Sequence, residues 1–92
     1  MRVRWTESAV RDLTSICDYI ENHDSPHAAR AVALRIVEGV DSLVKFPRRG
    51  RIGSDPATRE LVLAGSPWLV IYSVDDDAVE ILRILHGAQK RP

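Results

Sequence analysis

The chain has 92 residues, of which 45% are apolar and 28% are charged, and its 13 basic and 13 acidic side chains cancel. These values predict one globular domain over residues 1–92 and exclude an intrinsically disordered chain. No apolar run approaches the roughly 20 residues that a transmembrane helix needs. The single cysteine, Cys17, has no partner for an internal disulfide, so we expect a cytoplasmic protein that does not contact the membrane.

A short strand and an amphipathic helix are predicted in the first quarter of the chain. Residues Arg2–Trp5 alternate arginines with apolar side chains, which favours an edge strand with one buried face. Thr6 or Ser8 can cap a helix that runs to about Asn22, because a side-chain oxygen accepts a bond from an orphan backbone N–H. The apolar stripe of this helix consists of Val10, Leu13, Ile16, Cys17 and Ile20.

A second amphipathic helix is predicted directly after a break in the first. Ser25 is a good N-cap, and Pro26 fits the first helical position, where its missing N–H costs nothing. This helix should end before Pro47, and only a few residues separate it from the first helix, so we expect an antiparallel hairpin. Its apolar stripe consists of Ala29, Val32, Ala33, Ile36, Val37, Val40, Leu43 and Val44.

Two histidines, His23 and His27, lie at the connection between these helices. No cysteine or carboxylate at ligand spacing completes a metal site with them, so we interpret both as exposed polar residues. We therefore expect no metal and no cofactor.

The second half of the chain is organised around a predicted β-hairpin. Two runs rich in β-branched and aromatic residues, Trp68–Val74 and Ala78–His86, flank a turn of three aspartates at 75–77. The first run is apolar on both of its faces apart from Ser73, which is typical of a central strand. Residues 59–63 should form one more strand, and a short polar tail follows Gly87.

Residues 46–56 form the longest stretch without periodicity and predict an irregular basic loop that carries Arg48, Arg49 and Arg51. Together with the basic tail, this loop could meet an anionic partner such as RNA, DNA or an acidic peptide. Solvated arginines without a partner are the alternative.

The predicted order is therefore β-α-α-β-β-β, without repeats or linkers. It corresponds to an α+β fold in which an N-terminal helical hairpin covers one face of a mainly antiparallel sheet.

An ordered set of short motifs runs through nearly the whole chain and resembles the RelE/ParE superfamily of type II toxin–antitoxin toxins. The C-terminal motif followed by a basic tail looks closer to the ParE-like branch. The matching segments are Val3-Arg4-Trp5, Ala9-Val10-Arg11-Asp12-Leu13, Tyr19-Ile20, Pro26 with Ala28-Ala29, Leu43, Phe46-Pro47, Gly50-Arg51, Thr58-Arg59-Glu60-Leu61, Pro67-Trp68, Val70-Ile71-Tyr72 and Leu82-Arg83-Ile84-Leu85-His86-Gly87.

This resemblance implies a small bacterial toxin that a cognate antitoxin wraps and neutralises, and that reaches operator DNA only through the antitoxin. It also implies one of two targets. ParE-like members inhibit DNA gyrase and are not known as hydrolases, whereas RelE-like members enter the ribosomal A site and cut mRNA.

The residues help to choose between these targets. Metal-free RNA cleavage requires an acid, a base and cations around the developing phosphorane charge. Where ribonuclease members place cations, this chain has Glu60, Val62 and Leu69, so the expected cationic pocket is largely missing. The residues that remain for a catalytic site are Arg59, Arg83 and His86, together with Lys90 and Arg91 of the C-terminal tail.

We therefore expect a toxin that acts by binding, with gyrase as its target and residues Arg83, His86, Gln89, Lys90 and Arg91 as its contact surface. An arginine in an apolar strand must either emerge on the open face or be paired, so Arg83 is the most informative of these. Antitoxin contacts are expected at Arg48, Arg49 and Arg51. A ribosome-dependent mRNA endonuclease and a toxin relic kept for its antitoxin complex and autoregulation remain as alternatives.

Overall fold

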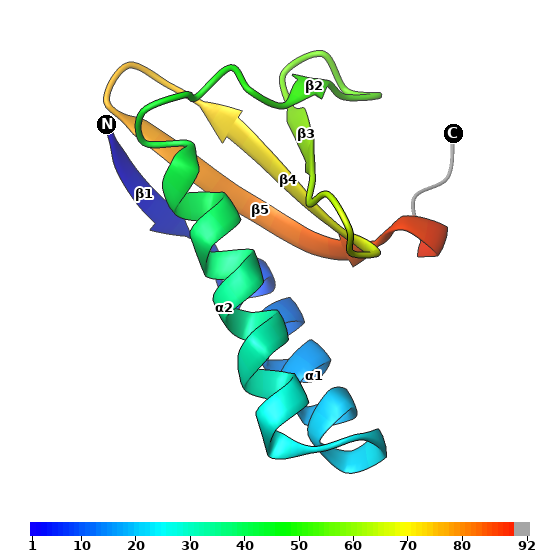
Figure 1. The fold of residues 1–92 in the computed structure, drawn as a ribbon. Coiled ribbons are helices and arrows are strands. Elements are labelled where there is room, and N and C mark those ends of the chain that lie inside the picture. The colour runs from blue at the N-terminus through cyan, green and yellow to red at the C-terminus, as the bar shows by residue number, and fades with distance from the viewer. Residues whose placement is uncertain (90–92) are drawn as a thin grey trace.

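A computed structural model describes residues 1–89 and shows two antiparallel helices packed on a five-stranded sheet (Figure 1). The sheet has the order β1-β5-β4-β3-β2, in which β1 pairs parallel to β5 and all other neighbours are antiparallel. The elements are β1 (Arg2–Trp5), α1 (Glu7–His23), α2 (Pro26–Ser42), β2 (Arg51–Ile52), β3 (Arg59–Val62), β4 (Trp68–Val74), β5 (Ala78–His86) and a 3₁₀ turn, η1 (Gly87–Gln89). The predicted α+β fold is confirmed.

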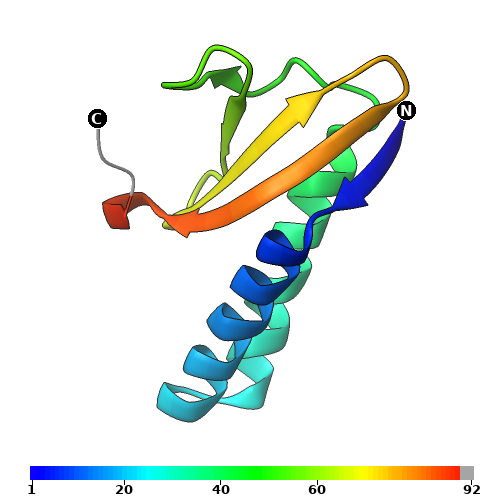
Figure 2. The same ribbon diagram turned by 180° about the vertical axis from the view of Figure 1, so that it is seen from behind.

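Local capping signals start both helices. The Thr6 hydroxyl accepts a hydrogen bond from the Ala9 N–H at 3.1 Å, and the Ser25 hydroxyl accepts one from the Ala28 N–H at 3.0 Å. Pro26 occupies the first position of α2, as expected. The turn between the helices projects well beyond the sheet in both views (Figures 1 and 2). Neither helix in residues 1–89 has the length and apolar character that crossing a bilayer requires.

One part of the predicted order is wrong, because residues 46–56 are not entirely irregular. Arg51 and Ile52 form β2, which pairs antiparallel with Glu60 and Arg59 of β3. A two-residue strand leaves no alternation in the sequence, and it exists here because β3 offers an edge to pair with. The order is thus β-α-α-β-β-β-β.

The core lies between the helical hairpin and one face of the sheet. Tyr72, Ile36, Leu43 and Val40 are among its largest fully buried side chains. The predicted stripes are wrong at Val10, which is 48% exposed, and at Val44, which is also exposed. The remaining buried apolar residues of the cluster are Ala9, Ile16, Leu61, Leu63, Val70, Val79, Ile81 and Ile84.

The N-terminal end of α1 completes the edge of β5. Strand β1 pairs only with the first four residues of β5, as far as Ile81. Beyond that point the Thr6 hydroxyl donates to the Ile81 carbonyl at 2.8 Å and to the Leu82 carbonyl at 3.1 Å. Six residues later, the Asp12 carboxylate accepts a hydrogen bond from the Ile84 N–H at 2.9 Å. These side chains satisfy backbone groups that a sixth strand would otherwise have to pair.

Candidate functional site

Arg83 is paired with a carboxylate of α1. Its Nε and Nη2 atoms donate to the two oxygens of Asp12 at 2.7 and 3.1 Å, which is the bidentate geometry that favours arginine over lysine. Partial burial acts to raise the pKa of Asp12, but the hydrogen bonds from Arg83 and from the Ile84 N–H outweigh it and lower that pKa. The same pair raises the pKa of Arg83. The Arg83 side chain is still 50% exposed, so it is both paired and accessible.

The end of β5 presents an aromatic pair. The His86 ring lies edge-on against Trp68 with 5.3 Å between the ring centroids. The Ala88 N–H donates to His86 Nδ1 at 3.1 Å, and the Gly87 N–H donates to the Pro67 carbonyl at 2.7 Å, so the start of η1 is attached to the β3–β4 turn. Gln89 ends η1, and the predicted contact residues Lys90 and Arg91 lie outside the described residues.

The three candidates for RNA cleavage do not converge. Arg59 pairs with Tyr72 across the sheet, whereas Arg83 pairs with Ile71. The register shifts between these two pairs because Leu82 is an extra residue in β5, whereas β4 has none. Successive residues of β4 therefore still point to opposite faces, so Arg59 and Arg83 project from opposite sides of the sheet. His86 is opposite Trp68, four residues along β4 from Tyr72, which corresponds to about 13 Å of strand.

Glu60 lies where a cationic ribonuclease pocket would need positive charge. Its side chain is only 5% exposed, and Oε1 accepts hydrogen bonds from Arg51 Nε and Nη2 at 3.3 and 3.2 Å. This part of the sheet is therefore electrostatically balanced instead of cationic. The sequence shows Arg51 as a loop residue, and the pairing of β2 with β3 is what turns it toward Glu60.

The arginine loop, residues 46–50, is held by a buried hydroxyl. Tyr72 donates to the Pro47 carbonyl at 2.8 Å and accepts from the Gly50 N–H at 2.8 Å. Burial raises the pKa of Tyr72 despite the opposing hydrogen bond from Gly50, so the phenol remains protonated and able to donate. A Cβ on Gly50 would lie 2.6 Å from that hydroxyl, so only glycine fits this close approach.

Two more side chains fix the same loop. Arg59 Nη1 donates to the Gly50 carbonyl at 2.7 Å and to the Arg48 carbonyl at 3.3 Å. Arg49 Nη1 donates to the Ser42 hydroxyl at 2.7 Å, which ties the loop to the end of α2. Arg59, predicted as a catalytic candidate, thus lies against the loop that carries two of the three predicted antitoxin contacts, Arg48 and Arg49.

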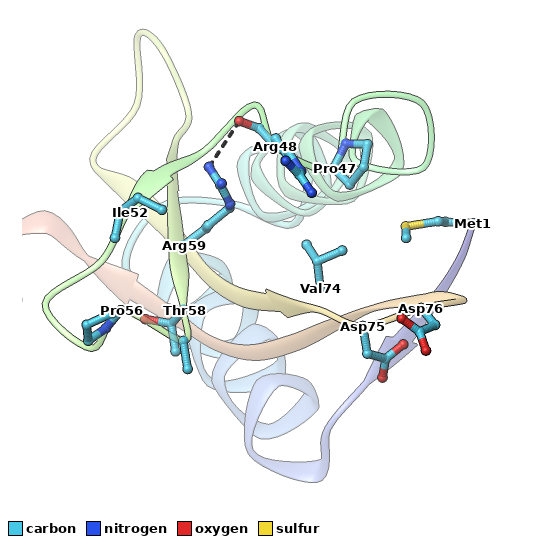
Figure 3. A pocket seen from close by; sticks show the side chains of 11 residues that line it. Met1, Pro47, Arg48, Ile52, Pro56, Thr58, Arg59, Val74, Asp75 and Asp76 are labelled. Atoms are coloured by element: carbon cyan, nitrogen blue, oxygen red, sulfur yellow. Dashed lines mark hydrogen bonds between the residues drawn. The ribbon is translucent and has the colours of Figure 1, made fainter.

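A cavity of about 850 Å³ opens beside this loop, between it, the β2–β3 turn and the β4–β5 turn (Figure 3). We call it the arginine cavity. Arg48 and Arg59 lie on one side, Asp75 and Asp76 lie on the other, and Val74 lies between them. The remaining lining includes Met1, Pro47, Ile52, Pro56 and Thr58.

Sequence reasoning missed Asp12, Tyr72 as a clamp, and Glu60 as a buried partner. Asp12 belongs to one of the matching segments, but its partner Arg83 is 71 residues away, so no local signal connects the two. Within residues 1–89, no three or more His, Cys, Asp and Glu side chains are arranged to hold a metal ion.

Comparison with known proteins places these features in a family. Over 91 residues the chain is 47% identical to the predicted toxin Y4kP of Sinorhizobium fredii, covering 99% of this chain and 93% of that protein. It is 44% identical to toxin RelE2 of Caulobacter vibrioides, covering 96% and 97% of the two chains.

A solved structure shares the fold. A chain from the chromosomal ParDE TA system of P. aeruginosa superposes with a TM-score of 0.85 at 32% identity, covering 94% of this chain and 95% of that one. Residues 3–91 match the family described as the ParE toxin of the type II toxin–antitoxin system parDE. The chain therefore belongs to the ParE toxin family of type II toxin–antitoxin systems.

Proposed function

We propose that this toxin inhibits DNA gyrase by binding it, and that a cognate antitoxin neutralises it. Family membership supports the proposal. The observation that carries the choice of binding over catalysis is that Arg59 and Arg83 project from opposite faces of the sheet, with His86 further along it. A metal-free ribonuclease needs such groups within hydrogen-bonding reach of one phosphate.

The proposed gyrase-contact surface is the C-terminal end of β5 and the residues that follow it. Trp68 and His86 supply an aromatic pair on one face of the sheet. Arg83, three residues before His86 in the same strand, supplies a half-exposed guanidinium on the other face, so the proposed surface runs around the end of β5. Aromatic residues and arginine are the usual dominant contributors at protein interfaces. Gln89, Lys90 and Arg91 extend this surface along the sequence and complete the proposed contact set.

A ribosome-dependent mRNA endonuclease is the second candidate, because one relative at 44% identity bears the name RelE2. His86 would then act as acid or base, since an imidazole titrates near neutral pH. A third possibility is a relic kept for its antitoxin complex, which would meet operator DNA only through the antitoxin.

One pair of assays separates these candidates. The purified toxin is added to gyrase during DNA supercoiling, and separately to translating ribosomes whose mRNA is mapped by primer extension. We expect inhibition of supercoiling and uncut mRNA. Codon-positioned cuts with supercoiling unaffected would overturn the gyrase proposal, and an inert protein in both assays would favour the relic.

A truncation tests the contact surface. Removing residues 88–92 keeps the Gly87 N–H bond to the Pro67 carbonyl and leaves β5 whole, so folding should be retained. We expect gyrase inhibition to fall by at least about tenfold, because dominant interface residues contribute 2 kcal/mol or more, whereas antitoxin binding persists. The matched control is Arg30→Gln, which removes one exposed cation from α2. Unchanged inhibition by the truncated toxin would remove this tail from the proposed surface.

A further inference from the structure

The arginine cavity carries an inference about how the antitoxin is held. We propose that it is an anchor site for a single acidic side chain of the antitoxin, whose carboxylate is bound by Arg48 and Arg59 while a neighbouring apolar side chain lies on Ile52 and Val74. This anchor rests on the proposed antitoxin partnership and gives it a specific place and chemistry.

The positive charge on this side of the cavity is not neutralised by the chain itself. Arg59 Nη1 donates to the neutral carbonyls of Gly50 and Arg48. Among the described carboxylates, none forms an ion pair with Arg48 or Arg59, although five other arginines of the chain have such partners. Two guanidinium groups lining one cavity repel each other, and a bound carboxylate would relieve that repulsion with charge-assisted hydrogen bonds.

The loop is held in place before any partner arrives. Tyr72 fixes the backbone on both sides of Arg48 through Pro47 and Gly50, and Arg59 bonds to the Arg48 carbonyl itself. A partner therefore has to order one arginine side chain and not a loop. Preorganisation of this kind raises affinity because less conformational entropy is lost on binding.

The other side of the cavity restricts what can bind. Backbone N–H groups of Asp77 and Ala78, helped by Arg4, lower the pKa of Asp75, so this carboxylate stays ionised. Asp76 and Asp77 add two more acidic side chains at the same turn. A nucleic acid would bring several phosphates toward these aspartates, whereas a peptide can direct one carboxylate toward the arginines and none toward the turn.

The apolar side chains that line the cavity favour a peptide over a free anion as its occupant. Ile52 is 58% exposed, and Val74 lies between the arginines and the aspartates (Figure 3). Covering such surface stabilises a complex by about 25 cal/mol per Å². A free inorganic anion would leave this apolar surface exposed to water. An acidic residue and an apolar residue two positions apart in an extended segment point the same way and match both features.

The position of the cavity separates the anchor from the gyrase-contact surface. Val74 and Trp68 are at opposite ends of the seven-residue strand β4, which corresponds to about 20 Å.

Of the predicted antitoxin contacts, Arg48 lines the cavity, while Arg49 is bonded to Ser42 and Arg51 to Glu60. Arg48 should therefore contribute more to antitoxin binding than either neighbour.

The test is a binding titration between the purified toxin and the antitoxin encoded beside it. Arg48→Gln should weaken binding by about 10- to 100-fold, the range expected when a charged hydrogen bond is lost. Arg30→Gln is the matched control and should bind within about twofold of the parent. Thermal melts of each free variant check folding, and Arg59→Lys, which keeps the charge but shortens the reach, should weaken binding without unfolding the chain.

Replacing each antitoxin acid in turn, with and without Arg48→Gln, identifies the partner. One carboxylate should show coupling to Arg48 in a double-mutant cycle. Arg48→Gln that binds the antitoxin as tightly as the parent overturns the anchor while leaving the partnership intact. The anchor is also overturned if the antitoxin acids show coupling to Arg49 or Arg51 and none to Arg48. It is overturned too if Arg48→Gln weakens the binding of the toxin to duplex DNA but leaves antitoxin binding unchanged. A parent toxin that binds no antitoxin overturns the proposed partnership, and the anchor with it.

Discussion

Two arginine-bearing regions of this small sheet have opposite electrostatic arrangements. At the edge of β5, Arg83 is held by both oxygens of Asp12. At the arginine cavity, Arg48 and Arg59 share one side with no carboxylate partner among the described residues. An arginine with an internal carboxylate partner can stabilise the fold, whereas one without remains available to an external anion.

This difference changes how substitutions in each region should be interpreted. Replacing Arg83 would remove a proposed gyrase contact and also leave Asp12 without its guanidinium partner, so a loss of toxicity would have two causes. Among residues 1–89, the Arg48 side chain has no hydrogen bond or ion pair that its replacement would remove. The arginine cavity is therefore the cleaner place to separate binding from folding.

Both regions are held by one hydrophobic core, and a substitution in this core should have the largest effect on stability. Ile36 is fully buried at the centre of α2. Ile36→Ala should lower the free energy of unfolding by about 2–5 kcal/mol, because it loses apolar burial and leaves a cavity. Urea denaturation measures this loss, with the exposed Leu34→Ala as control. A variant as stable as the parent would remove Ile36 from the core.

A smaller loss of stability is expected when the arginine loop loses its buried hydroxyl. Tyr72→Phe removes the hydroxyl that bridges the Pro47 carbonyl and the Gly50 N–H. We expect a loss of about 1–3 kcal/mol, because two backbone groups lose their buried partner. Hydrogen exchange should also become faster at the Gly50 amide. Tyr19→Phe, at an exposed position of α1, is the control and should change neither quantity.

The smallest effect concerns the paired region. Asp12→Asn should cost about 1 kcal/mol, a modest value because Arg83 is half exposed and its ion pair is screened by water. The folded-state pKa of Asp12 is lowered, so its contribution is present above the unfolded value of about 3.9 and is lost as the pH falls through the folded value.

Denaturation curves at several pH values measure this contribution. Between about pH 6 and pH 3 the parent should lose more stability than Asp12→Asn, since the variant has no carboxylate to protonate. Asp18→Asn, an exposed position on α1, is the matched control and should follow the parent. Parallel curves for the parent and Asp12→Asn would show that the pair does not stabilise the fold.

Features that depend on neighbouring residues could be predicted from the sequence. Thr6, Ser25 and Pro26 identify the helix starts because capping involves residues within one turn. The bounds of β4 and β5 follow from continuous apolar runs around a turn of aspartates. Helical periodicity located the buried residue Ile36 for the same reason, although Val10 has the right spacing and still lies on an exposed part of α1.

Features that depend on distant residues were decided only by the tertiary structure. Strand β2 exists because β3 offers it an edge, and its pairing brings Arg51 to Glu60. The Asp12–Arg83 pair joins residues 71 positions apart. The arginine cavity likewise forms where Tyr72, in the central strand, fixes a loop 25 residues earlier. A sequence specifies which charges are present, but which of them are neutralised depends on distances that exist only after the sheet and helices have packed.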